Sequence, residues 1–303
     1  PVAGVQVWCD GQQLPGVTDA QGQLTYTFDI PTTSAHVLYA MDTDGGRSWN
    51  INIPVCDWAV DGNGAPFGIQ NNAIDKADTS VSITWMSAIA YRQEYGLIRY
   101  ATSAEGIASA NKIQIDSKIL AFDETNSGNA MRLHTANLQG LQPGTTYYYQ
   151  VGDGEKWSDV LSFTTASDDP NATTEFIVMG DIQTDNTANL AAVLNQIKNK
   201  NYSFAVQTGD AIDGVKSFSQ WRALFTVLNS ATFKTPMIHA LGNHEYYGAA
   251  NGEISSEIFT LPESAQGAYY SVEYGSVYIG VINNGGDFAA AVAEMKEDAA
   301  KSD

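Results

Sequence analysis

Three short strings in this sequence place oxygen-bearing side chains directly after a glycine. They are Gly180-Asp181-Ile182-Gln183, Gly209-Asp210-Ala211-Ile212-Asp213 and Gly242-Asn243-His244-Glu245. Carboxylate and amide oxygens are the ligands that hard divalent cations prefer. Glycine lets the backbone turn sharply and come close to a bound ion. If the strings converge in the fold, they predict a cation site that still needs further ligands.

Each string follows a short apolar segment typical of a buried strand, at residues 176–179, 204–207 and 236–240. The intervening segments, 187–199 and 217–228, carry apolar residues at helical spacing. The apolar positions are Leu190, Val193, Leu194 and Ile197 in the first helix, and Phe218, Trp221, Leu224, Phe225 and Leu228 in the second. This order predicts a βαβαβ unit with right-handed crossovers. Ligands bind at the carboxyl ends of such strands, so the three strings should line one edge of the sheet.

The order and spacing of the GD-x-x, GD-x-x-D and GNHE strings resemble the calcineurin-like metallophosphoesterase superfamily. A single Gly-Asp would mean little because it is a common turn, but GNHE at a strand end after two such strings is a specific signature. The segment before the strings is similar to the N-terminal domain of purple acid phosphatases and their bacterial relatives. In that family this domain directly precedes the catalytic strings.

The resemblance implies a function and a role for each residue. Members of the superfamily hold two metal ions, bridged by a carboxylate and a water or hydroxide, and hydrolyse phosphate esters by in-line attack. Asp181 would bind the first ion, Asp210 would bridge both, and Asn243 would bind the second. His244 would contact the phosphate or act as acid to the leaving group. The implied activity is metal-dependent hydrolysis of phosphate monoesters or diesters.

Two positions depart from the family pattern. Asp213 stands where purple acid phosphatases have the tyrosine that binds ferric iron, so a purple ferric site is not expected. Gln183 stands where other members have a histidine, and its amide is a weaker donor than imidazole. A first site of Asp181, Gln183 and Asp210 favours manganese, magnesium or calcium over zinc, while the identity of the two ions, iron included, stays open. Asp213 either binds a metal or orients His244.

A third departure concerns the end of the chain. The family completes its site with later histidines, whereas this sequence has none after His244. The helix predicted at 288–301 lies before those strands in relatives. We therefore expect a shortened or cleaved chain with only the N-terminal half of the phosphoesterase domain. It supplies three or four ligands where two cations need about eight to twelve. Such an open sheet should expose an apolar edge through which chains can associate.

Residues 1–60 alternate apolar and polar positions around 5–9, 24–28 and 37–41, which predicts a small immunoglobulin-like β-sandwich. The only two cysteines, Cys9 and Cys56, fall near the start and end of this segment. A disulfide between its edge strands fits a secreted protein. Two buried free thiols fit the sequence equally well.

Residues 66–167 predict a second, fibronectin type III-like sandwich, with neighbouring strands at 81–85 and 95–100 and Trp85 in its core. The segment 141–147, Leu-Gln-Pro-Gly-Thr-Thr-Tyr, resembles the fibronectin corner. There a tyrosine hydroxyl bonds back to the backbone, and Tyr147 fits that role. Strand alternation favours core packing of the tyrosines at 147–149 over a carbohydrate platform.

Residues 174–303 predict the partial α/β phosphoesterase domain, an α+β sandwich that includes a hairpin at 269–281 turning at Gly275. The fold class is thus multidomain: two all-β sandwiches followed by this partial domain. Among the other histidines, His239 lies mid-strand and His36 and His134 lie in the β segments. We expect these three to be packed side chains without a role in the site.

The chain carries 15 basic and 34 acidic residues, a net charge of -19. This charge disfavours nucleic acid and anionic membranes as partners. No segment is long and apolar enough to span a membrane. The sequence starts at Pro1 without a leader, so we expect a secreted or cell-surface protein of bacterial type whose signal peptide is not in this chain.

A second hypothesis belongs to a different class. The chain could be a cell-surface binding or adhesion protein that keeps the phosphoesterase scaffold with a decayed site. Gln183, Asp213, the missing histidines and the two tandem β modules favour it. Metal content distinguishes the two hypotheses, because the enzyme would hold two ions tightly.

Overall fold

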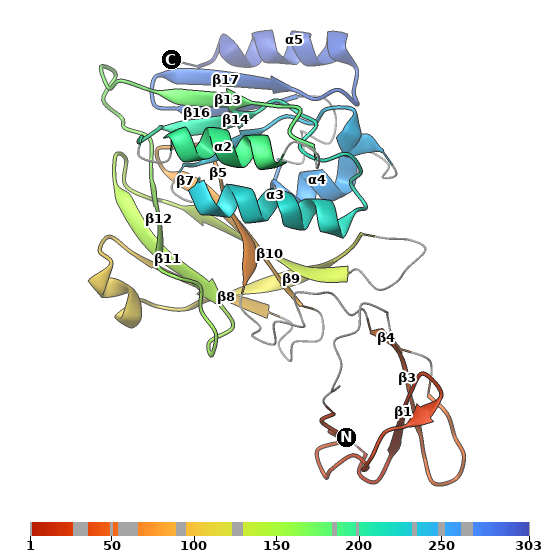
Figure 1. Ribbon diagram of the computed structural model, residues 1–303. Coiled ribbons are helices and arrows are strands. Elements are labelled where there is room, and N and C mark those ends of the chain that lie inside the picture. Colours follow the sequence, from red (N-terminus) through yellow and green to blue (C-terminus); the bar gives the residue numbers. More distant parts are fainter. Residues whose placement is uncertain are drawn as a thin grey trace.

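The computed structural model describes residues 2–26, 36–48, 51–53, 66–88, 95–122, 130–183, 187–197, 200–231, 235–247, 252–261 and 269–302. Figure 1 shows the chain from the N-terminal strands, drawn in red, to the C-terminal helix, drawn in blue. No helix in these ranges is both long and apolar enough to cross a membrane.

The N-terminal segment forms one antiparallel sheet. Its strands are β1 (Gln6–Cys9), β2 (Gln12–Gln13), β3 (His36–Met41) and β4 (Ile51–Ile53), in the order β2-β1-β3-β4. The described part of this segment contains no second sheet, so the predicted sandwich stays a prediction. Cys9 is a buried free thiol, and Cys56 lies outside the described residues.

The strand predicted at 24–28 is wrong over residues 24–26, which form no regular structure; residues 27 and 28 lie outside the described ranges. The carboxylate of Asp19 accepts hydrogen bonds from the backbone N–H groups of Gln21 and Gln23, both at 2.9 Å. Such local bonds use donors that a strand ladder would need. The segment therefore turns where alternation alone predicted an extended strand.

The second segment forms a β-sandwich. One sheet holds β5 (Phe67–Asn72), β7 (Ser80–Ala88) and β10 (Ala130–Gln139); the other holds β8 (Tyr95–Ala101), β11 (Thr146–Gly152) and β12 (Leu161–Thr164). Strand β9 (Ile113–Ala121) pairs with β8 along its first half and with β10 along its second half. It therefore joins the two sheets at a corner. A short 3-10 helix, η1 (Glu105–Ser109), connects β8 to β9.

The prediction that 81–85 and 95–100 are neighbouring strands is wrong. Strand β7 pairs with β5 and β10, whereas β8 pairs with β9 and β11. The two strands face each other across the core, where the ring of Trp85 lies over Gly96. A Cβ on Gly96 would come within 2.5 Å of that ring. Trp85 is 1% exposed, which confirms its predicted place in the core.

The corner predicted at 141–147 is confirmed. The backbone N–H of Gln142 donates to the hydroxyl of Tyr147 at 2.9 Å. Tyr147 and Tyr149 are buried core residues, whereas Tyr148 is only half-buried on the opposite face of β11. Core packing thus explains two of the three tyrosines.

Replacing Tyr147 with phenylalanine is expected to lower the free energy of unfolding by about 1 kcal/mol, because the Gln142 N–H loses its partner at no change in packing. Urea unfolding measures the effect. Tyr148→Phe is the matched control, since its hydroxyl makes no hydrogen bond within the described residues. Equal unfolding midpoints for the two variants would contradict a stabilising corner.

The third segment contains the predicted βαβαβ unit. Strands β13 (Phe176–Met179), β14 (Phe204–Gln207) and β15 (Met237–His239) are parallel and adjacent, and α2 (Thr187–Ile197) and α3 (Phe218–Ala231) connect them. Strand β15 also bonds to β5 of the sandwich. A single ten-stranded sheet, in the order β12-β11-β8-β9-β10-β7-β5-β15-β14-β13, therefore runs through both segments.

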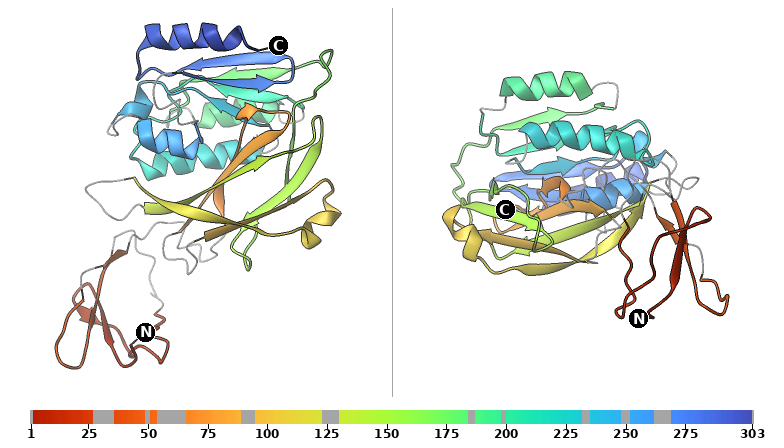
Figure 2. Two further views of the ribbon diagram at one scale, coloured as in Figure 1. Left: turned by 180° about the vertical axis from the view of Figure 1, so that it is seen from behind. Right: turned by 60° about the horizontal axis from the view of Figure 1, so that its bottom comes forward.

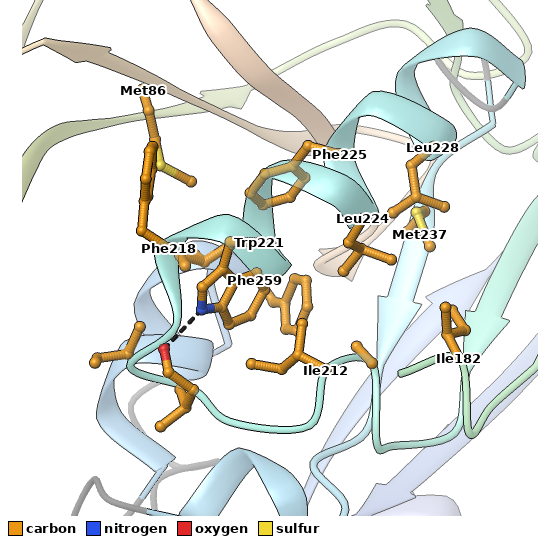
Figure 3. Close-up of a cluster of buried hydrophobic side chains, with 14 of the residues drawn as sticks. Met86, Ile182, Ile212, Phe218, Trp221, Leu224, Phe225, Leu228, Met237 and Phe259 are labelled. Atoms are coloured by element: carbon orange, nitrogen blue, oxygen red, sulfur yellow. Dashed lines mark hydrogen bonds between the residues drawn. The ribbon is translucent and has the colours of Figure 1, made fainter. Parts of the chain in front are cut away.

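Helix α3 supplies the centre of the largest core. Its five predicted apolar residues are all buried, and Trp221 is fully covered while its indole N–H donates to the carbonyl of Val215 at 2.7 Å (Figure 3). The same cluster contains Met86 and Phe122 of the sandwich segment. The two segments thus share one hydrophobic core. In α2, Leu190 and Leu194 are buried as predicted, but Val193 is 57% exposed.

A hairpin covers the face of the parallel strands that lies opposite helices α2 and α3. Strands β16 (Tyr269–Tyr274) and β17 (Val277–Ile282) form a three-stranded sheet with β6 (Asp75–Lys76), and α5 (Phe288–Ala299) packs on its outer side (Figure 2). The chain turns at Gly275 as predicted, with φ +59°. Between β15 and the hairpin lie η3 (His244–Tyr246) and α4 (Glu253–Ile258).

The first strand of the unit is not buried as predicted. Strand β13 lies at the edge of the ten-stranded sheet, and its residues Phe176 and Val178 are 48% and 60% exposed. They share the face that the hairpin covers on β14, where Phe204 is buried. The prediction of an apolar, uncovered edge therefore agrees with this strand.

Candidate metal centre

The three strings meet at the carboxyl ends of β13, β14 and β15. The backbone N–H of Asp181 donates to the carbonyl of Gly209 at 3.1 Å, and that of Gln183 donates to the carbonyl of Asp210 at 3.3 Å. The backbone N–H of His244 donates to Oδ1 of Asp210 at 3.0 Å. The structure thus brings the predicted residues of all three strings together at one edge of the sheet.

The glycines let the strings pack against one another. A Cβ on Gly209 would lie 2.6 Å from the backbone nitrogen of Gly242, and a Cβ on Gly242 would lie 2.2 Å from Oδ1 of Asp210. A Cβ on Gly180 would lie 2.1 Å from Oγ1 of Thr208. A side chain at Gly209 or Gly242 would force neighbouring backbone to shift, and one at Gly180 would displace the Thr208 hydroxyl. Close approach between neighbouring loops explains these glycines without any bound ion.

Glu245 holds two of the strings together from below. It is fully buried, and its carboxylate accepts hydrogen bonds from the backbone N–H groups of Asp210 (2.9 Å), Ala211 (2.8 Å) and Gly242 (2.8 Å). Burial raises the pKa of this carboxyl, while the three backbone donors oppose the shift. The sequence pattern predicted no role for Glu245. The only sign of one was an acidic residue at the end of a polar string.

Three non-glycine residues of the strings adopt left-handed backbone conformations. The φ angles are +47° for Asp181, +45° for Gln183 and +55° for Asp210. Such conformations are unfavourable for most side chains, although Asp tolerates them better than other residues. They persist where the surroundings hold them, often at functional sites. Here the bonds between the strings supply that restraint.

The ring of His244 is fixed on both nitrogens. Nδ1 lies 2.8 Å from the carbonyl oxygen of Asp213. A carbonyl only accepts, so Nδ1 carries a proton, and Nε2 of the neutral ring accepts from the amide nitrogen of Gln183 at 3.2 Å. Asp213 therefore contacts His244 through its main chain, whereas sequence reasoning considered only its side chain.

The donor chemistry of the strings fits a hard cation. Asp181 and Asn243 are exposed and Asp210 is half-buried. The amide nitrogen of Asn243 donates to the hydroxyl of Tyr247 at 2.8 Å, so the amide oxygen is the atom left for a cation. The described residues contain no group of three or more His, Cys, Asp or Glu side chains that could hold a metal. Suitable donors are present, but the set is incomplete.

Two of the remaining histidines are packed as predicted. His239 is 1% exposed and stacks on Phe259 with ring centroids 3.7 Å apart; burial lowers its pKa to about 3. His134 is 1% exposed, stacks on Trp85 and contacts the hydroxyl of Ser87 at 2.8 Å; burial lowers its pKa to about 4. The side chain of His36 lies outside the part of the chain whose burial is described.

Comparison with known families agrees with this arrangement. Residues 66–165 match the family described as purple acid phosphatase, N-terminal domain, and residues 174–294 match the calcineurin-like phosphoesterase family. Residues 174–294 therefore form a calcineurin-like phosphoesterase domain. Acid phosphatase type 7 of Danio rerio is 26% identical over 219 residues, 70% of this chain and 45% of that protein. Purple acid phosphatase 23 of Arabidopsis thaliana is 26% identical over 211 residues, 56% of this chain and 45% of that protein.

Solved structures share the fold of this chain. The purple acid phosphatase PPD1 from yellow lupin (Lupinus luteus) seeds superposes with a TM-score of 0.65 at 17% identity, covering 90% of this chain and 55% of that chain. PhoD superposes with a TM-score of 0.54 at 14% identity, covering 73% and 52%. The chain spans less than half the length of the curated relatives it matches.

Proposed function

We propose that this chain belongs to a hydrolase that cleaves phosphate monoesters or diesters at a pair of divalent metal ions. The convergence of Asp181, Asp210, Asn243 and His244 at the carboxyl ends of three parallel strands carries the proposal. The names of the relatives, acid phosphatase and purple acid phosphatase, support the substrate class. The remaining metal ligands would come from residues other than those of the three strings.

The residues of the strings have distinct proposed roles. Asp181 would hold one ion and Asn243 the other, and Asp210 would help to hold both. Gln183 and the carboxylate of Asp213 are further candidate ligands. When bound, the metal ions supply charge neutralisation of the phosphate and activation of water; the oxygen-rich donor set favours manganese, magnesium or calcium, with iron or zinc as alternatives.

His244 is the proposed general acid. The Asp213 carbonyl fixes the ring through Nδ1, which leaves Nε2 as the nitrogen that would take up a proton and pass it on once the Gln183 amide no longer donates to it. Proton donation to the leaving oxygen would complete P–O cleavage as water oxygen bonds to phosphorus. Gln183, next to Nε2, would position the ring or the phosphate. A secreted or cell-surface location remains part of this proposal.

Hydrolysis of p-nitrophenyl phosphate and bis(p-nitrophenyl) phosphate tests the function. The source protein, including any sequence that follows this chain, is loaded with manganese, iron or zinc and compared with its Asp210→Ala variant. Asp42→Ala, which removes an exposed carboxylate from the N-terminal segment, is the matched control. We expect hydrolysis by wild type and Asp42→Ala and none by Asp210→Ala. Equal rates for all three would refute the proposal.

One observation favours the second hypothesis, a binding or adhesion protein with a decayed site. Within the described residues, no three His, Cys, Asp or Glu side chains are placed so that they could hold a metal ion. Metal analysis of the source protein separates the hypotheses. Two tightly held ions per chain, lost in Asp210→Ala, support the enzyme; no bound metal at saturating supply supports the binding protein.

A further inference from the structure

A groove of about 840 Å³ lies on the side of the molecule away from the three strings. One wall is the outward face of β11 and β12, with Tyr148 and Ser162 paired across the two strands. The other wall is built from residues just before β13, β14 and β15, including Thr174 and Tyr202, and from the hairpin turn at 275–276. Because the parallel strands start at this groove and end at the strings, the two places lie at opposite ends of the sheet.

The lining of the groove is rich in uncharged hydroxyl groups. Thirteen of its twenty-two residues are Ser, Thr or Tyr, while Lys200 and Asp169 are its only charged residues. Within the described part of the chain, the hydroxyls of Tyr148, Ser162 and Tyr202 make no hydrogen bond, so they remain available to a ligand. Both tyrosines are half-buried, and each therefore leaves part of its ring accessible.

This chemistry selects a ligand class. A ligand with many hydroxyls can exchange hydrogen bonds with Ser, Thr and Tyr, which both donate and accept. The two tyrosine rings offer apolar surface for the C–H faces of a sugar. One positive and one negative lining residue, in a chain of net charge -19, give no attraction for an anion. The volume of the groove falls in the range of about 300–1,000 Å³ that is typical of ligand pockets. Such pockets often lie where two domains meet, as this groove does.

We propose that this groove binds a neutral oligosaccharide and so gives the protein a carbohydrate-binding site separate from the metal centre. The site does not depend on the proposed phosphoesterase activity. It would place a second ligand on the same rigid sheet and hold the protein on a glycan while the strings at the other edge stay accessible.

Isothermal titration with cellohexaose, xylohexaose, maltohexaose and chitohexaose tests the proposal on the intact protein. We expect at least one hexasaccharide to bind, and Tyr202→Ala and Tyr148→Ala each to weaken binding about tenfold or more, as for buried aromatic contacts elsewhere. Tyr26→Ala, which removes an exposed tyrosine of the N-terminal segment, should bind like wild type. Circular dichroism verifies that all three variants are folded.

Two outcomes would overturn it. The first is that none of the four sugars gives a binding heat at about 10 mM, a concentration at which even millimolar affinity is detected. The second is binding that Tyr148→Ala and Tyr202→Ala leave unchanged. A capped hexapeptide of alternating serine and threonine is measured alongside. If it binds and the sugars do not, the groove receives a peptide along the free edge of β12 instead.

Discussion

Replacing Glu245 with alanine is expected to lower the free energy of unfolding by about 3–5 kcal/mol, as when one partner of a buried charged network is removed. The three backbone N–H groups of Asp210, Ala211 and Gly242 all donate to this fully buried carboxylate. Without it they would be buried donors lacking partners. The loops that carry Asp210 and Asn243 would then separate, so metal affinity should fall together with stability.

Glu245→Gln refines this prediction. Its amide keeps one oxygen acceptor but replaces the other with a donor that opposes a backbone N–H, so we expect an intermediate loss of about 2 kcal/mol. Urea unfolding of the metal-free protein measures both variants. Glu253→Ala, at an exposed position in the first turn of α4, is the control and should stay close to wild type. A Glu245→Ala protein as stable as this control would show that the carboxylate does not hold the loops.

The place of the candidate site could be predicted from the sequence because strand order and glycine position determine it. Each string follows an apolar strand, and parallel strands present their carboxyl ends at one edge. The roles of Glu245 and of the Asp213 carbonyl could not be predicted in this way. The Glu245 carboxylate binds the main chain of a different string, and the Asp213 carbonyl binds a ring thirty-one residues away. No residue pattern predicts such contacts.

The errors in predicting the fold have a common cause. The periodicity of apolar residues does not show whether another element packs over the face that they form. Val193 and Val178 fit apolar patterns, yet both are largely exposed because nothing packs over them in the described part of the chain. The prediction that β7 and β8 pair was wrong for a related reason. Successive strands of a sandwich can cross from one sheet to the other, and alternation is the same whether two strands pair or face each other.

The structure also changes how the glycines are understood. Sequence reasoning linked them to the approach of an ion. The observed short distances are between loops, with Gly209 against Gly242 and Gly242 against the Asp210 carboxylate. The glycines therefore allow the three strings to pack together. That packing brings the oxygen donors to one place.

Acidification is expected to destabilise this protein through His239. In the folded protein its pKa is about 3, because the buried ring loses hydration. The ring lies stacked on Phe259. Neither ring nitrogen has a hydrogen-bond partner in the described residues. In the unfolded chain the pKa returns to about 6.5. Above that pH the ring is neutral in both states and stability is complete. As pH falls below 6.5 only the unfolded chain takes up the proton, so stability falls until the folded pKa is reached.

The slope approaches about 1.4 kcal/mol for each pH unit per such histidine once the unfolded ring is mostly protonated, so His239 should remove about 2 kcal/mol between pH 6.5 and 4.5. His134, whose folded pKa is about 4, should add a similar loss over that interval. Urea unfolding of wild type, His239→Phe and His134→Phe at both pH values measures the two contributions separately.

His239→Phe should reduce the acid loss by about half, because it keeps the aromatic stack on Phe259 and removes the titrating group. His134→Phe should have the same effect on the acid loss but should lower stability at pH 7, since the contact with Ser87 disappears. An acid loss in His239→Phe equal to that of wild type would mean that His239 is protonated equally in the folded and unfolded chains. Such a result would contradict the burial of this ring under Phe259.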